Sequence, residues 1–210
     1  MKTKRKALLL SLCAVLLVVA SVMCTMAYLT STDTVTNTFT VGNVQITLDE
    51  AKVNPDGTLV PNAERVKANS YKLLPGRTYI KDPTVTVKAG SESSYIKMTV
   101  TFSKAAELDA IFAPTGGANL TSIFNGYDSD NWIEKGSTTA ANTRTYEFWY
   151  KETVDARTAD VVLDALFDSI TVPGSITKEQ LATIEGLTIT VNAYAIQAAG
   201  FANAEEAWAA

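Results

Sequence analysis

Apolar and polar residues alternate with period two over several stretches of this chain, a pattern typical of strands with one buried face. The clearest stretch is residues 95–102, in which every even-numbered residue is apolar and the odd-numbered ones are mostly polar. The same alternation occurs at residues 84–88, 143–150 and 186–197, and a shorter strand is predicted at residues 166–172. Turn-forming Pro and Gly residues lie between these stretches. The pattern therefore predicts antiparallel strands joined by tight connections.

The segment DTVTNTFTVGNVQITLDE, residues 33–50, also alternates, but its apolar face changes partway. Its apolar residues are odd-numbered in residues 34–41 and even-numbered in residues 44–48. Because a slip of one residue turns every side chain to the other face, the chain needs a bulge or bend at Gly42 and Asn43. The segment is therefore predicted to form two separate strand pieces.

Helical segments are few and short. Three are predicted, each after a candidate N-cap residue: Ser103, Thr177 and Asn203. Many strands with a few helical connections predict an all-β fold, an antiparallel β-sandwich of jelly-roll type with a few short helices in the connections. The chain has neither an internal repeat nor a low-complexity linker, so one domain is expected.

The N-terminus combines a basic start with a long apolar run. Four Lys or Arg residues occur within the first six positions, and the next charge is Asp33. This arrangement is typical of a signal peptide. We expect an N-terminal signal helix within residues 1–27, cleavage after Ala27 to leave Tyr28 as the new terminus, and a single domain over residues 28–210.

The same run allows two alternatives to cleavage after Ala27. It is long enough to span a bilayer, so an uncleaved anchor is one alternative, and a lipid on Cys24 is the other. With cleavage, membrane contact is limited to the signal segment, and the protein is expected to be secreted, extracellular or associated with the cell surface.

The composition of the mature chain excludes some kinds of site. Both cysteines, Cys13 and Cys24, lie in the signal, so neither a disulfide nor a thiolate metal site is expected. The signal also holds four of the 18 basic residues and none of the 22 acids, which leaves a mature net charge of −8. An acidic domain of this kind repels phosphates, so no nucleic-acid partner is expected.

The chain contains no histidine at all. Histidine is the commonest catalytic base near neutral pH, and a zinc-binding HExxH helix needs two of them. A Ser-x-x-Lys pattern occurs at Ser94 and Lys97, but on a strand an offset of three places the two side chains on opposite faces. We therefore expect a protein that is not an enzyme, with no catalytic residue, cofactor or metal.

Weaker binding signals remain open. Asp128, Asp130 and Asn131 bring calcium-type ligands to one loop, without the glycine and glutamate of an EF-hand loop. In the aromatic stretch YEFWY, Glu147 and Trp149 are the residues expected on the polar face, where a ring could stack on a sugar. Asn-Leu-Thr at residues 119–121 is a glycosylation sequon by pattern.

Three blocks of the sequence resemble a known protein family. The first is the signal together with TVTNTFTVGNVQITLDE, the second is LLPGRTYIKDPTVTVKAGSESSYIKMTVTF, and the third is ITVNAYAIQAAGFANAEEAWAA. In these blocks the chain is similar to the TasA/camelysin-like family, exported proteins of Gram-positive bacteria with a SipW-type signal peptide. Residues 104–185 match less distinctively.

The resemblance implies a secreted protein of the cell surface or biofilm matrix, processed by a signal peptidase of SipW type. It also implies fibres in which the N-terminal segment of one subunit completes the sheet of the next subunit. The next subunit is either a further copy of this chain or a related matrix protein. In this chain the residues expected in such a donor strand are Thr34, Val35, Phe39 and Val41. Strand addition of this kind is physically reasonable, because an exposed sheet edge carries unpaired backbone groups.

Two other functions are open. One is a surface module that binds a ligand or glycan. The other is a secreted peptidase, because some members of the family are called camelysins and are assigned to a metallopeptidase family. The absence of histidine argues against that activity here, so no catalytic residue is transferred from the family.

Overall fold

The structure is a computed structural model that describes residue 6 and residues 12–18, 42–112 and 123–210. The chain divides into two compact units, Met1–Val41 and Gly42–Ala210. In the first unit, the described residues 12–18 are helical. Among the residues that the structure describes, no helix has the length and apolar character needed to cross a membrane.

Several predicted residues lie outside the described part of the chain. They are the cleavage-site residues Ala27 and Tyr28 and the donor-strand residues Thr34, Val35, Phe39 and Val41. The sequon at residues 119–121 also lies outside it. The signal helix, the cleavage point and the donor strand therefore stay predictions.

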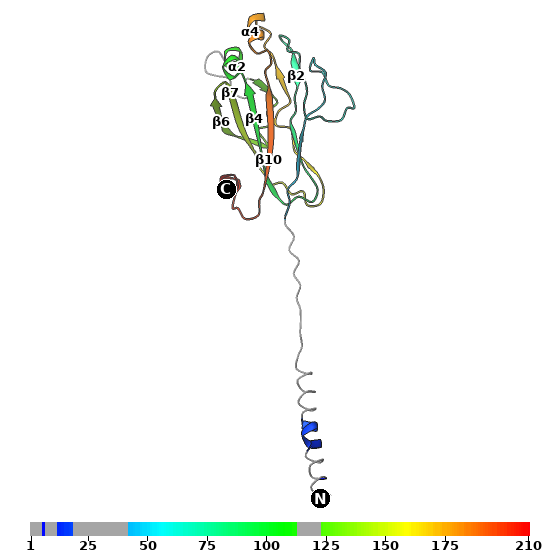
Figure 1. The fold of residues 1–210 in the computed structure, drawn as a ribbon. Coiled ribbons are helices and arrows are strands. Elements are labelled where there is room, and N and C mark those ends of the chain that lie inside the picture. Colours follow the sequence, from blue (N-terminus) through cyan, green and yellow to red (C-terminus); the bar gives the residue numbers. More distant parts are fainter. Residues whose placement is uncertain (1–5, 7–11, 19–41, 113–122) are drawn as a thin grey trace. The chain divides into compact units, whose positions relative to one another are not determined.

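The second unit contains three antiparallel sheets (Figure 1). The four-stranded sheet has the order β10 (Ile189–Gln197), β4 (Ser94–Ser103), β7 (Thr143–Tyr150), β6 (Trp132–Ala140). The first three-stranded sheet is β1 (Ile46–Asp49), β3 (Thr84–Val87), β8 (Val161–Val162), and the second is β2 (Thr78–Ile80), β9 (Ser169–Thr171), β5 (Phe124–Asn125). The helices are α2 (Ala105–Phe112), α4 (Lys178–Thr183) and α5 (Ala204–Ala209). The predicted all-β fold is confirmed, whereas the jelly-roll order of its strands stays a prediction.

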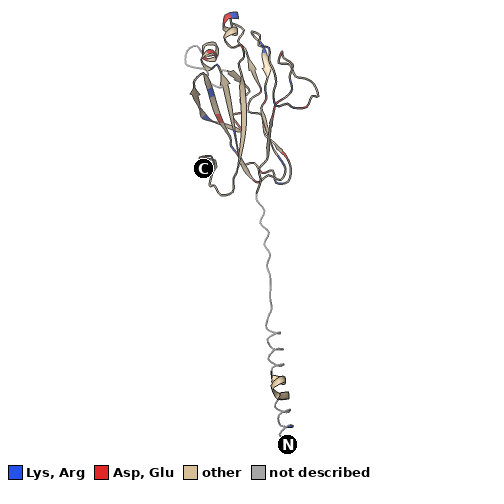
Figure 2. Cartoon of the chain, in the orientation of Figure 1, with Lys and Arg blue, Asp and Glu red and all other residues tan. Residues whose placement is uncertain are grey.

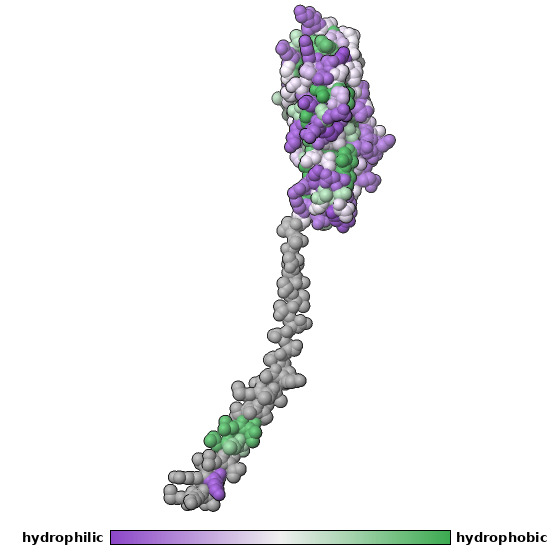
Figure 3. Space-filling model, turned by 90° about the vertical axis from the view of Figure 1, so that its right-hand side faces the viewer, coloured by the Kyte–Doolittle hydropathy of each residue, from purple (hydrophilic) through white to green (hydrophobic). Residues whose placement is uncertain are grey.

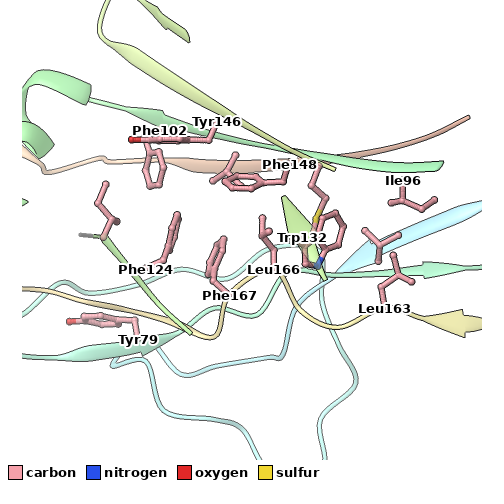
Figure 4. Close-up of a cluster of buried hydrophobic side chains, with 14 of the residues drawn as sticks. Tyr79, Ile96, Phe102, Phe124, Trp132, Tyr146, Phe148, Leu163, Leu166 and Phe167 are labelled. Carbon is pink, nitrogen blue, oxygen red and sulfur yellow. The ribbon is translucent and has the colours of Figure 1, made fainter. Parts of the chain in front are cut away.

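Strand β4 lies at the centre of the four-stranded sheet, between β10 and β7. Its predicted inner residues, Ile96, Met98, Val100 and Phe102, are all buried. They meet side chains of the opposite layer, such as Phe124, Leu166 and Phe167, in a single apolar core (Figure 4). Alternation along the sequence was sufficient here, because burying one face of a strand fixes the direction of every side chain.

Strand β6 was not predicted. Of its nine residues only Trp132 is buried, and the other eight are exposed, so its sequence shows no alternation. Backbone pairing with β7 holds this edge strand in place, with a bulge between Glu134 and Gly136. A strand that buries almost nothing leaves little hydrophobic pattern in the sequence.

The predicted helix caps met different outcomes. Thr177 forms a capping box with Gln180, and Asn203 accepts a hydrogen bond from the backbone of Glu206, so both predictions are confirmed. The prediction for Ser103 is wrong, because this residue ends β4. The start of α2 is instead capped from a distant turn, where Asn142 Oδ1 accepts a hydrogen bond from the backbone N–H of Ala106 at 3.0 Å.

The first strand of the unit, β1, begins at Ile46, two residues after the predicted start. Its even-numbered residues Ile46 and Leu48 pack on the core, as predicted. Gly42 and Asn43 precede the strand, at the start of the unit. The predicted bend there stays a prediction, because residues 19–41 lie outside the described part.

Acidic and basic residues are both spread over the second unit (Figure 2). Several of the acids form ion pairs with Lys or Arg. Hydrogen bonds from Arg157 lower the pKa of Asp155 to about 2. Hydrogen bonds from Lys88 and from Lys135 likewise lower the pKa values of Asp160 and Glu205.

These pairs, together with the absence of histidine, predict how stability depends on pH. A carboxylate with a lowered folded-state pKa stabilises the fold above its unfolded pKa of about 4, and this contribution is lost as the pH falls toward the folded value. We expect a thermal unfolding midpoint that is nearly constant between about pH 5 and pH 7 and falls between about pH 4 and pH 2. Circular dichroism melts at pH values across this range measure the midpoint. A large change in the midpoint centred near pH 6 would contradict the prediction.

Candidate functional site

The second unit carries a groove of about 960 Å³ whose lining is mostly apolar. Its walls are residues 67–73, the helix α4 and residues 187–191 at the start of β10. Its floor reaches core side chains that include Phe102 and Leu108. We refer to this site as the groove. A volume of this size is near the upper end of the range for ligand pockets.

The β10 wall of the groove is an incompletely covered part of the core. Leu187, Ile189 and Val191 pack against the core cluster but remain only half-buried, unlike the fully buried residues of β4 beside them. On the opposite wall, Tyr71 and Leu73 are half-buried in the same way. Additional apolar atoms placed in the groove would therefore remove more of this surface from water, which is favourable.

A free strand edge accompanies the groove. Among the described strands, β10 pairs with β4 on one side and has no neighbour on the other. Such an edge presents unpaired backbone N–H and C=O groups, which can accept a further strand. Hydrophobic side chains are also exposed as separate patches among hydrophilic ones on one face of the unit (Figure 3).

One buried ion pair, Glu50 with Lys81, lines the groove. Lys81 Nζ donates a hydrogen bond to Glu50 Oε2 at 2.6 Å, and both side chains are less than a tenth exposed. Asn69 Nδ2 donates to Glu50 Oε1 at 3.1 Å and to the carbonyl of Ala51 at 2.8 Å. Buried charges need partners of this kind, since an unpaired one would cost several kcal/mol.

Tyr71 lies close to this pair and is held by a hydrogen bond from its hydroxyl to the carbonyl of Ile80 at 3.1 Å. Burial raises the pKa of Tyr71 well above its ordinary value, and the negative charge of Glu50 raises it further. The phenol therefore stays neutral at physiological pH and acts as a hydrogen-bond donor.

The predicted calcium ligands form a local turn. Asp128 Oδ1 accepts hydrogen bonds from the backbone N–H groups of Asp130 and Asn131, and Asn131 Nδ2 donates to Asp128 and Asp164 at 2.9 and 3.1 Å. These hydrogen bonds use both carboxylate oxygens of Asp128 and one of Asp164. Within the described ranges, no three acidic, cysteine or histidine side chains are arranged to hold a metal ion.

The aromatic face that was predicted to bind a sugar, at Glu147 and Trp149, is covered by other side chains of the chain. Tyr146 and Phe148 are in the core. Trp149 Nε1 donates to Glu147 Oε1 at 2.7 Å, while Lys135 Nζ lies 4.1 Å from the centre of the Trp149 ring. A cation over the ring takes the place that a sugar would need. The geometry therefore does not favour this tryptophan as a glycan site.

Ser94 and Lys97 lie on opposite faces of β4. Ser94 is fully buried, whereas Lys97 Nζ lies on the outer face, 4.4 Å from the centre of the Trp208 ring. This separation follows from the strand geometry that the sequence predicted. The two residues are not placed to act together.

Sequence reasoning missed most of the groove. No strand was predicted at residues 67–73, and neither Lys81 nor Glu50 was predicted as a site residue. The available signal was weak: Leu187, Ile189 and Val191 were predicted to share one face, but nothing in the sequence indicated that this face would be only half covered.

Comparisons of the chain with protein-family models, curated proteins and solved structures found no match.

Proposed function

We propose that this chain is an exported, non-enzymatic structural protein of the cell surface or biofilm matrix, whose subunits form fibres by donor-strand addition. The observation that carries the proposal is the apolar groove beside the unpaired edge of β10. A strand added there would gain backbone hydrogen bonds from the edge and apolar burial from the groove. The resemblance to the TasA/camelysin-like family supports the same function.

The proposed occupant is the segment of residues 34–41 from a second copy of the chain. Val35, Phe39 and Val41 alternate with threonines, so one face of an extended segment would be mostly apolar and the other polar. Removal of the signal after Ala27 by a signal peptidase of SipW type would free this segment. The groove would then receive the apolar face.

Addition of this kind is head to tail, because the donor segment and the groove are different surfaces of the subunit. Contacts of this type do not close on themselves unless the rotation happens to form a ring, so they generate filaments. The partner is a further copy or a related matrix protein. In this proposal the inserted strand completes a sandwich of jelly-roll type.

A second function rests on the volume of the groove. A site of about 960 Å³ with apolar walls is large enough for a small molecule with an apolar body. The chain would then be a surface ligand-binding module rather than a fibre subunit. This ligand would compete with the donor segment for the same walls.

Deletion of the donor segment tests the proposal. We expect the mature chain, residues 28–210, to form fibres visible by negative-stain electron microscopy, and residues 42–210 to stay monomeric. The shorter chain should still fold, since the described core lies within Gly42–Ala210. N-terminal sequencing of the exported protein locates the cleavage. Equal polymerisation of the two chains would contradict donor-strand addition, and two monomeric chains would favour the ligand-binding module.

A further inference from the structure

The apolar face of the proposed donor segment contains one polar residue. Along residues 34–41 the odd-numbered positions are Val35, Asn37, Phe39 and Val41. If the three apolar side chains face the groove, the period of two turns Asn37 toward it as well. An amide buried there without hydrogen-bond partners would cost about 1–3 kcal/mol.

The groove contains a matching polar position. Of the residues that line it, Glu50 and Lys81 are the buried charged ones within the described part of the chain. Lys81 Nζ can donate three hydrogen bonds, and the described residues supply one acceptor, Glu50 Oε2. The other groove-lining residues with charged side chains are at least partly exposed. Asn69, which also lines the groove, already donates to Glu50 Oε1. The pair is therefore the buried charged position of the groove within the described residues.

We propose that Asn37 of the inserted segment hydrogen bonds to the Glu50–Lys81 pair and thereby fixes the register of donor-strand addition. This inference rests on the proposed function. The amide oxygen accepts from Lys81 Nζ, and the amide N–H₂ donates to the Glu50 carboxylate, so each group gains a partner of the right kind.

The register follows from the cost of the alternatives. A shift of two residues keeps the same face toward the groove, but it places Val35 or Phe39 against the ion pair and moves Asn37 away from it. A single buried polar residue fixes register in coiled coils for the same reason. Apolar contacts alone discriminate poorly between such shifts, because one hydrophobic side chain replaces another.

A binding experiment with exchanged partners tests this inference. The acceptor is the unit of residues 42–210, either unchanged or with Glu50→Leu and Lys81→Met together. The donor is a fluorescent peptide of residues 28–41, either unchanged or with Asn37→Leu, and a Thr38→Leu peptide is the control on the opposite face. Fluorescence anisotropy gives the affinity of each combination, and thermal melts confirm that both acceptors are folded.

We expect Asn37→Leu to weaken binding to the unchanged acceptor by about 10- to 100-fold, and to strengthen binding to the doubly substituted acceptor relative to the unchanged peptide. Thr38→Leu should change neither affinity appreciably. An equal effect of Asn37→Leu on both acceptors would overturn the register proposal while leaving donor-strand addition intact. If no peptide binds the unchanged acceptor, the proposed function itself fails. Glu50→Gln with Lys81→Met replaces the double variant if the latter unfolds.

Discussion

Replacing Lys81 by methionine is expected to lower the free energy of unfolding by about 3–5 kcal/mol. The substitution removes the cation that lies 2.6 Å from Glu50 Oε2 and leaves the carboxylate buried with Asn69 as its remaining side-chain donor among the described residues. Desolvation of an unpaired charge is far more costly than the loss of one hydrogen bond. Urea unfolding of the mature chain, followed by circular dichroism, measures the change.

Two variants serve as controls for this prediction. Lys88 is paired with Asp160, but both side chains are about two-fifths exposed, so Lys88→Met should lower the free energy of unfolding far less than Lys81→Met does. The combination of Glu50→Leu with Lys81→Met removes both buried charges, so its stability should return to within about 1–2 kcal/mol of the unchanged chain. A loss for Lys81→Met no larger than that for Lys88→Met would contradict the burial of the pair.

Replacing Val191 by lysine is expected to abolish fibre formation by the mature chain. Val191 lies on the β10 wall of the groove and is half-buried, so an isolated subunit can accommodate the longer side chain by directing its ammonium group to solvent. An inserted strand would cover that charge and leave it without a partner. The matched control is Asn192→Lys, because Asn192 is exposed on the opposite face of the same strand and should leave assembly unchanged.

Mixing the Val191→Lys variant with the unchanged chain also tests whether fibres grow head to tail. The variant keeps its donor segment but has a blocked groove, so it should join one end of a fibre and stop growth there. A substoichiometric amount should therefore shorten fibres of the unchanged chain, as measured by electron microscopy. Unchanged fibre lengths, or assembly of the variant by itself, would show that the groove does not receive the donor segment.

The strands that could be predicted are those that bury one face. In β4 the alternation from Ile96 to Phe102 matches the buried face residue by residue. Strand β6 was missed because it is held by backbone pairing at a sheet edge and buries only Trp132. Apolar residues alternate along a strand when one of its faces is buried, so a strand with almost no buried residues shows no such pattern.

The helix caps show the same limit at a smaller scale. Thr177 and Gln180 are three residues apart, so their reciprocal capping could be predicted from the sequence. The cap of α2 comes from Asn142, 36 residues from Ala106, and only the pairing of β4 with β7 brings that turn to the start of the helix. The wrong prediction for Ser103 arose because a local rule was applied to a long-range contact.

The sequence by itself determined the all-β class, the inner faces of the long strands and the absence of histidine, because these depend on residue type and local spacing alone. The tertiary structure decided that β10 has a free edge and that a groove lies beside it. It also decided that Lys81 reaches Glu50 across 31 residues of chain. Such features depend on which segments pack together. A half-buried apolar residue and a fully buried one also look the same in the sequence, so the sequence does not show where the core is left uncovered.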